Sequence, residues 1–288
     1  GKEQRYMAKV LPPKVARLVL KRMSDDYKDS GLLNAVESFN SGPVPEEILL
    51  DISPGSGFYW DDVNGGVLDS DKVQEARKEE IGWIKKQGVY KVVDIQECWD
   101  ETGKGPISLV WVDTNKGDDL RPIYRSRLCV REIKKLNRGE LSPHEVFSAM
   151  PPLEGMKLLG SLMMSKGHSK RGKPLKLAFW DISRAHFYGQ AQRKVYIKLP
   201  DEEYQEGKCG LLLKSMYGTQ DASHIWQGDY SNLLVTNGHI QGISNGALFY
   251  NESDDARSLV HGDDFMVLGD EDAIEAMDKL LRLSLIHI

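Results

Sequence analysis

The chain has 288 residues, of which 40% are hydrophobic and 28% are charged, and its formal net charge is −5. These values are ordinary for a globular protein with one large domain or two smaller ones. The negative charge at first argues against a nucleic-acid partner, and the absence of any run of about 18 apolar residues excludes a transmembrane helix.

The cysteines and histidines exclude two further classes of site. Cys98, Cys129 and Cys209 are far apart in the sequence and never form a C-x-x-C pair. This usage indicates a reducing compartment and argues against a structural zinc site. The histidines show no H-E-x-x-H spacing, so a zinc enzyme is not expected either.

Positive charge is concentrated in two segments, although the total charge is negative. Residues 121–138 contain seven arginines and lysines and a single acidic residue, Glu132. Residues 166–176 contain five arginines and lysines and no acidic residue. Local basic segments of this kind form phosphate-binding surfaces, but they also occur as solvated loops. The sequence leaves both interpretations open.

The N-terminal half is irregular at first and then regular. Residues 1–70 have weak periodicity and several turn signals, and we expect an irregular arm with one short helix at 15–23. A helix is predicted from an N-cap near Asp69 to Gly88, followed by strands at 89–95, 107–112 and 120–133. In the last of these strands, alternation places Arg125 and Arg127 on one face.

Two helices follow before the pattern returns to strands. Ser142 to Glu145 has the S-x-x-E capping pattern, and a second helix is predicted at 153–165. We expect its core side to be formed by Leu153, Met156, Leu159, Leu162 and Met163. Strands are then predicted at 175–181, 195–199 and 209–214, and the first of them ends in Asp181.

The C-terminal part alternates between helices and short strands. Asp221 is expected to cap a helix that ends at 237–238, and Asp270 a final helix. Between them, strands are predicted at 247–250, 256–260 and 265–269. From residue 175 onward this order predicts an α+β fold, with helices on one face of a mainly antiparallel sheet and the other face open.

The strongest chemical signal is an acidic turn between two apolar runs. Gly262-Asp263-Asp264 separates two such runs, and this pattern predicts the tip of a β-hairpin. Carboxylates at the end of a rigid ribbon suit hard cations. Asp181 alone could be a helix cap, and the Asp pair alone a solvated turn. Together they suit a two-metal phosphoryl or nucleotidyl transfer site.

The chain resembles the copia-type retrotransposon reverse transcriptases in several blocks that keep the order of that family. Residues 181–189 are similar to the family's D-V-K-T-A-F-L-N-G, and residues 195–200 to its V-Y-M-K-Q-P. Residues 214–226 are similar to K-S-L-Y-G-L-K-Q-A-P-R-A-W. Shorter blocks resemble L-F-Y at 248–250, Y-V-D-D at 261–264, Y-K-A-R-L-V at 124–129 and F-S-P at 147–148.

The resemblance implies reverse-transcriptase-like fingers at 72–155 and a palm at 156–282. These would lie between the irregular arm at 1–70 and a non-native tail at 283–288. It implies RNA- or DNA-templated DNA synthesis from a primer and deoxynucleoside triphosphates, with two Mg²⁺ ions or Mn²⁺ in their place. The chain would be a fragment of a polyprotein that also carries RNase H and integrase. It would be intracellular, either cytoplasmic and particle-associated or nuclear, without membrane contact. Alone it would be weakly active or inactive, with little or no processive activity.

The resemblance also assigns roles to individual residues. Asp181, Asp263 and Asp264 would be the catalytic, metal-binding carboxylates. Arg125 and Arg127 would meet the incoming triphosphate, since a guanidinium group binds phosphate in a forked geometry. Four further residues would contact the nucleotide or template: His186, Phe187, Tyr217 and Gly218.

Three positions differ from the family pattern. His186 stands where the family usually has an aromatic side chain that excludes a ribose 2′-hydroxyl, and His261 stands where it has tyrosine. Asp221 replaces a glutamine and places a negative charge where phosphates are expected. These differences support a second hypothesis, a catalytically decayed relic or non-catalytic nucleic-acid-binding module with the same fold. A third hypothesis is a metal-dependent nuclease that uses the same carboxylates.

Overall fold

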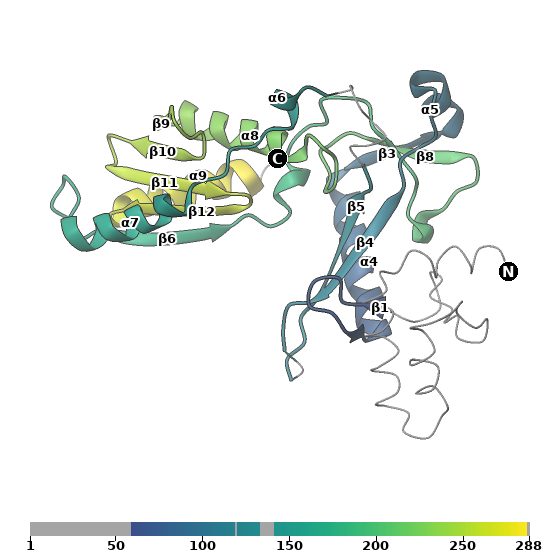
Figure 1. Cartoon of the computed structure of the whole chain (residues 1–288), viewed down its shortest axis with the longest axis horizontal. Coiled ribbons are helices and arrows are strands. Elements are labelled where there is room, and N and C mark those ends of the chain that lie inside the picture. The colour runs from purple at the N-terminus through teal and green to yellow at the C-terminus, as the bar shows by residue number, and fades with distance from the viewer. Residues whose placement is uncertain (1–58, 119, 133–140, 287–288) are drawn as a thin grey trace, which may run out of the picture. The chain divides into compact units, whose positions relative to one another are not determined.

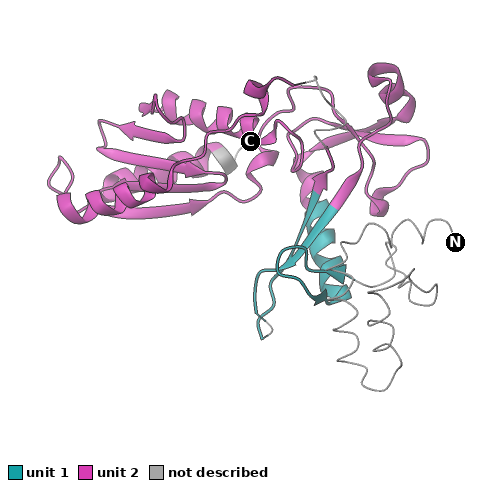
Figure 2. Cartoon of the chain, in the orientation of Figure 1, with its two compact units in different colours: residues 1–82, 111–128 teal, residues 83–110, 129–288 magenta. Residues whose placement is uncertain are grey.

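The computed structural model describes residues 59–118, 120–132 and 141–286 of the chain. The short helix predicted at 15–23 and the basic residues beyond Glu132 in the first basic segment lie outside this part. The chain divides into two compact units, one formed by residues 1–82 and 111–128 and the other by residues 83–110 and 129–288 (Figure 2). Each unit is described by itself below.

The first unit contains two antiparallel strand pairs and most of a long helix. Its elements are β1 (Tyr59–Trp60), β2 (Val67–Leu68), the greater part of α4 (Ser70–Gln87), and most of β4 (Leu109–Asn115) and β5 (Tyr124–Val130). The carboxylate of Asp69 accepts a hydrogen bond from the backbone N–H of Lys72 at 3.1 Å. The N-cap predicted there is confirmed.

Asp61 organises the segment between β1 and β2, which the sequence assigned to an irregular arm. Its buried carboxylate accepts hydrogen bonds from the backbone N–H groups of Val63, Asn64 and Asn115 at 2.9, 2.7 and 2.8 Å. Burial alone would raise the pKa of Asp61, but these bonds outweigh it and lower the pKa. Residues 59–68 are therefore ordered and joined to β4. The prediction was wrong for them because two-residue strands leave no periodicity.

The second unit contains two antiparallel sheets. The smaller has the order β3 (Tyr90–Asp94), β8 (Lys208–Leu212), β7 (Tyr196–Ile197). The larger has five strands, seen side by side in Figure 1, in the order β6 (Lys176–Asp181), β12 (Asp264–Gly269), β11 (Ala256–His261), β10 (Leu248–Asn251), β9 (His239–Gln241). All its pairings are antiparallel, as predicted. Only β9 was not predicted, since a strand of three residues carries little pattern.

The helices of the second unit largely match their predicted positions. They are α5 (Ile95–Thr102), α6 (Pro143–Val146), α7 (Leu153–Lys166), α8 (Ala222–Thr236) and α9 (Glu271–Ile286), with 3₁₀ turns η2 (Ala185–Phe187) and η3 (Asp201–Glu203). The capping box that begins at Ser142 is present, and α5 was not predicted. Because α9 reaches Ile286, part of the expected non-native tail is helical. None of the described helices is long and apolar enough to cross a membrane.

Helices pack against both faces of the five-stranded sheet, which corrects the prediction of helices on one face. Helices α8 and α9 bury one face, where Trp226 and Met277 belong to the same core as Phe265 and Val267. Helix α7 packs on the opposite face, where Leu159 lies in a second core with Leu259, Met266 and Leu268. Burial on both faces fixes which residues of each strand point to which side.

The orientation of α7 differs from the prediction, and the difference leaves part of a face open. Leu153 and Met156 are exposed, because the helix presents the stripe that begins at Gly155 and continues through Leu159. A Cβ at Gly155 would lie 3.0 Å from the Leu259 side chain, so the absent side chain permits this close packing. Beyond the reach of α7, Phe179 of β6 is 68% exposed. The sheet therefore has an uncovered end on the α7 side.

We predict that His239, the first residue of β9, makes the fold sensitive to mild acid. It is 7% exposed, its Nδ1 lies 3.2 Å from the carbonyl oxygen of Leu234, and burial lowers its pKa below 6.5. The unfolded chain therefore binds a proton near pH 6.5 that the folded chain rejects. Stability should be full above this pH and should fall as the pH drops from about 6.5 toward the lower, folded-state pKa.

Urea unfolding between pH 5 and 8 measures this effect. His239→Asn, whose amide can donate to the same carbonyl, should flatten the profile. The control His144→Asn removes an exposed histidine of α6 and should keep the acid-side loss. An identical loss in the His239→Asn variant would assign the effect to other groups.

Candidate active site

The acidic turn predicted from the sequence is the connection between β11 and β12. His261 and Asp264 are register partners, so the turn consists of Gly262 and Asp263 alone. Gly262 has φ +63°, a conformation that the first residue of such a two-residue turn requires and that glycine adopts without strain. The hairpin tip is confirmed, and Asp264 is the first residue of β12.

Strand β6 brings the third predicted carboxylate to this turn. Asp181 is the register partner of Asp264, and the backbone N–H of Ile182 donates to the carbonyl oxygen of Asp263 at 2.9 Å. Residues directly opposite in an antiparallel pair lie on the same face, with Cβ atoms about 4.5–5.5 Å apart. Asp181 and Asp264 are both exposed and Asp263 is half-buried. The structure thus brings together three residues that are far apart in the sequence.

His261 extends this row onto a third strand. It is the register partner of Asp264 on β11 and is exposed. Three consecutive strands therefore present Asp181, Asp264 and His261 on one face, at the end of the sheet that α7 does not cover. The next row inward on this face is apolar, with Phe179 opposite Met266. We call Asp181, Asp264 and His261 the acidic row, and it borders an otherwise hydrophobic surface.

Trp226 of α8 holds the turn from the other face of the sheet. Its indole Nε1–H donates to the carbonyl oxygen of Gly262 at 2.7 Å, and the side chain is 2% exposed. Its ring packs edge-on against Phe265 and Tyr230, with centroids 6.4 and 5.6 Å away. Trp226 lies in the helix predicted after Asp221, and no role at the turn was predicted for it. The tryptophan at the end of the family-like block 214–226 was the sequence feature that could have pointed to this role.

The carboxylates fit a hard divalent cation whose coordination is completed by substrate. Asp181 and Asp264 offer oxygen ligands, and Mg²⁺ is commonly held by one or two carboxylates together with water and phosphate oxygens. Within the described part of the chain, no three His, Cys, Asp or Glu side chains are grouped so as to enclose a metal ion by themselves. The donor set suits a cation that arrives with a phosphate.

The four residues predicted to contact the nucleotide or template differ in exposure, and only Phe187 is fully buried. Phe187 is 0% exposed and stacks on Trp83 with centroids 5.7 Å apart. Tyr217 packs edge-on against both His186 and Phe187, at 4.9 and 5.2 Å. His186 and Tyr217 are half-buried and Gly218 is exposed. Phe187 can therefore support the neighbouring rings but offers no surface to a ligand.

The turn at Tyr217 and Gly218 lies directly against Val130. The backbone N–H of Val130 donates to the carbonyl oxygen of Tyr217 at 2.7 Å. Gly218 has φ +86°, and a Cβ there would lie 2.1 Å from the carbonyl oxygen of Val130. Only glycine fits this close approach. The absence of a side chain at Gly218 therefore allows the turn to pack against the backbone at the end of β5.

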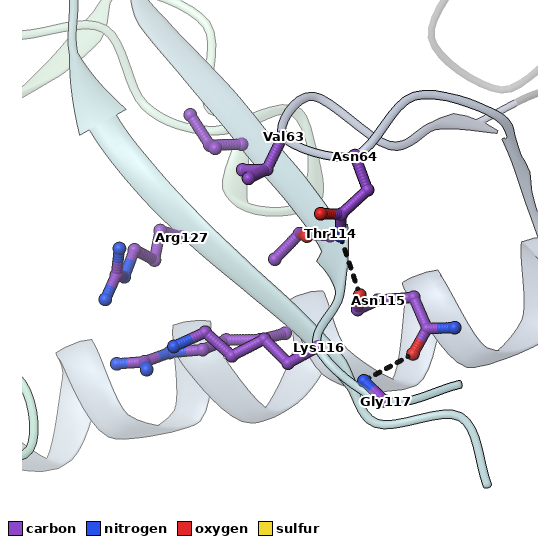
Figure 3. A pocket seen from close by; sticks show the side chains of 9 residues that line it. Val63, Asn64, Thr114, Asn115, Lys116, Gly117 and Arg127 are labelled. Atoms are coloured by element: carbon purple, nitrogen blue, oxygen red, sulfur yellow. Dashed lines mark hydrogen bonds between the residues drawn. The ribbon is translucent and has the colours of Figure 1, made fainter.

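Arg125 and Arg127 line a pocket of about 490 Å³ in the first unit. Figure 3 shows Lys116 and Arg127 extending in the same direction from neighbouring segments, with Asn64 on the far wall. The nine residues that line the pocket are all described, and none of them is acidic. The pocket is thus positively charged. Lys116 and Asn64 were not predicted as site residues, because they come from turns that carry no motif.

The second basic segment, residues 166–176, is not a free phosphate-binding surface. Its cations pair with carboxylates of the same unit: Lys166 with Asp255, Lys170 with Glu252, Arg171 with Asp254 and Asp270, Lys173 with Asp272, and Lys176 with Glu271. The sequence left open whether this segment binds phosphate. The structure argues against phosphate binding, because carboxylates distant in sequence neutralise the segment.

A comparison with protein families identifies one matching family. The family described as "Reverse transcriptase (RNA-dependent DNA polymerase)", which comprises the copia-type enzymes, matches residues 87–284, more than half of the chain. The matched region contains the acidic row, Trp226 and the turn at Tyr217. No curated protein matches the chain.

We predict that Trp226→Phe loosens the acidic turn. The substitution keeps an aromatic ring but removes the donor to the Gly262 carbonyl, which should cost about 1–3 kcal/mol of stability. Denaturant unfolding measures this loss, and hydrogen exchange should rise in β11 and β12. Trp180→Phe is the matched control, because its indole N–H donates at 2.9 Å to Asp278 on α9 and not to the turn. Equal exchange at the turn in both variants would contradict the assigned role.

Proposed function

The chain belongs to the reverse transcriptase (RNA-dependent DNA polymerase) family, and from this premise we propose that Asp181, Asp263 and Asp264 are its catalytic carboxylates. The observation that carries the proposal is the register of β6 with β12, which sets Asp181 opposite Asp264 beside the turn. The family uses a divalent metal, a nucleic-acid template and deoxynucleoside triphosphates. We assign the fingers to residues 72–155 and the palm to residues 156–282.

The acidic row would hold two Mg²⁺ ions, or Mn²⁺ in their place. When bound, such ions lower the pKa of an attacking hydroxyl and stabilise the leaving oxygen. Asp181 and Asp264 would supply oxygen ligands from two rigid strands, and Asp263 would supply a third from the turn. The primer 3′-hydroxyl and the α-phosphate of the incoming nucleotide would meet at this row. Trp226 would keep the turn in place during the reaction.

The pocket with Arg125 and Arg127 would bind the nucleotide triphosphate. Lys116 adds a third cation, and a pocket without acidic lining favours a polyanion. His186 and Tyr217 would line the nucleotide sugar or template, with Phe187 as their buried support and Gly218 as the exposed backbone. RNase H and integrase from the same polyprotein are the partners we propose.

The relic hypothesis retains one specific observation in its favour. His261, which departs from the family pattern, stands in the acidic row itself as the register partner of Asp264. A non-catalytic module would bind primer–template in a salt-dependent manner and extend nothing in Mg²⁺ or Mn²⁺. A nuclease would instead cleave single-stranded DNA. Primer extension, filter binding and cleavage on the same preparation distinguish the three.

We predict that Asp181→Asn and Asp263→Asn abolish primer extension. Loss of a metal-binding carboxylate removes several kcal/mol of transition-state stabilisation, so the rate should fall by about a thousandfold or more. Extension of a labelled primer in Mg²⁺ measures the rate. Asp272→Asn, which changes an exposed carboxylate at the start of α9, should retain the parent rate. Activity that survives either of the first two substitutions would contradict the metal-site assignment.

We predict that Arg125→Gln weakens nucleotide binding more than it slows chemistry. Removing one guanidinium from a phosphate pocket should raise KM for the nucleotide about tenfold with a smaller change in kcat. Single-nucleotide incorporation at varied nucleotide concentration measures both constants. Arg121→Gln is the matched control, since this arginine lies in the turn before β5 and does not line the pocket. Equal effects of the two variants would point to general charge and not to the pocket.

A further inference from the structure

An arginine in the second unit joins three segments that are distant in sequence. Arg193 lies in the stretch between η2 and β7, Glu132 follows β5, and Asp221 precedes α8. The guanidinium donates to both carboxylate oxygens of Glu132 at 2.8 and 2.6 Å. It also donates to both carboxylate oxygens of Asp221 at 2.8 and 3.1 Å. Two forked contacts on one guanidinium use nearly all of its donors.

The cluster is shielded from solvent. The side chains of Glu132, Asp221 and Arg193 are 1%, 9% and 21% exposed. Asp221 was predicted to cap α8, but its side chain makes no capping bond and is committed to Arg193. Burial alone would lower the pKa of Arg193, but the two carboxylates raise it, so the guanidinium stays charged.

The cluster lies beside the turn that carries Tyr217 and Gly218. Glu132 also accepts a hydrogen bond from the backbone N–H of Gln220 at 2.8 Å. Glu132 is two residues beyond Val130, whose backbone N–H holds Tyr217, and Asp221 closes the same turn on the other side. Arg193 therefore anchors the Gln220–Asp221 end of the turn, and the backbone of Val130, two residues before Glu132, holds Tyr217 at the other end.

From these contacts we infer that Arg193 is a positioning residue, which fixes the Tyr217–Gly218 turn and masks the charge of Asp221 beside the nucleotide site. The inference rests on the proposed function, because it assigns that turn to the nucleotide site. It explains how a carboxylate can stand where the family has a glutamine. Without Arg193, the buried carboxylates of Glu132 and Asp221 would lose the cation that they share, and the turn beside them would be destabilised.

Substitutions in the whole chain test this role with two independent readouts. Arg193→Gln removes the cation, and Arg193→Lys keeps the charge but cannot reach both carboxylates in forked geometry. The triple variant Glu132→Gln, Arg193→Gln, Asp221→Asn removes all three charges together. Arg257→Gln is the matched control, because Arg257 is 23% exposed and pairs with the buried Asp255.

The first readout is hydrogen exchange, which does not require activity. Arg193→Gln should accelerate exchange in peptides that contain Val130 and Gln220, and Arg257→Gln should not. The second is single-nucleotide incorporation on a primer–template in Mg²⁺. Arg193→Gln should raise KM for the nucleotide about tenfold with less change in kcat, and the triple variant should recover most of this loss because the repulsion is gone.

The outcomes test separately whether Arg193 positions the turn and whether the turn affects nucleotide binding. Unchanged exchange at Val130 and Gln220 in folded Arg193→Gln would overturn the positioning role, whatever the activity. Faster exchange with an unaltered KM would overturn the link to the nucleotide. If Arg193→Gln does not fold, Arg193→Lys and the triple variant decide by the same measurements. A parent chain that does not incorporate even a single nucleotide would refute the proposed function, and the exchange data would still decide whether Arg193 holds the turn.

Discussion

The antiparallel register between β6 and β12 is the constraint on which the rest of the proposed active site depends. A shift of one residue would turn every side chain of β6 to the opposite face. Asp181 would then point toward α8 and α9, and Trp180 toward the open end. The register is protected because both faces are buried: Phe265 and Val267 lie under α8 and α9, and Met266 lies under α7. Burial of apolar side chains thus fixes the position of a pair of carboxylates.

Most of the described carboxylates of the second unit outside the acidic row pair with cations, and Asp270 is an example. Asp270 is fully buried, and although burial would raise its pKa, hydrogen bonds from Arg171 and Ser169 lower the pKa to about 2. Such a carboxylate serves the fold, since its charge is already compensated. Asp181 and Asp264 stand opposite each other at the exposed end of the sheet, where a cation between them would stabilise two like charges.

The described part of the chain extends beyond the matched family region at its N-terminal side. Residues 59–68 pair as β1 and β2, and the Asp61 carboxylate joins them to β4. Asn64 from this segment lines the same pocket as Arg125 and Arg127. Family membership describes residues 87–284, but the pocket needs side chains from before that limit. The first unit is therefore best studied with residues 59–68 included.

The sequence by itself determined most of the second unit, because apolar alternation, capping residues and turn glycines act locally. It identified the strand that ends in Asp181 and the hairpin at Gly262, and the resemblance linked them to one family. Tertiary structure decided what local patterns cannot contain. It set Asp181 opposite Asp264, turned α7 so that one end of the sheet stays open, and buried Phe187 away from any ligand. It also paired Asp221 with Arg193, since a buried charge takes whichever distant partner the fold brings to it.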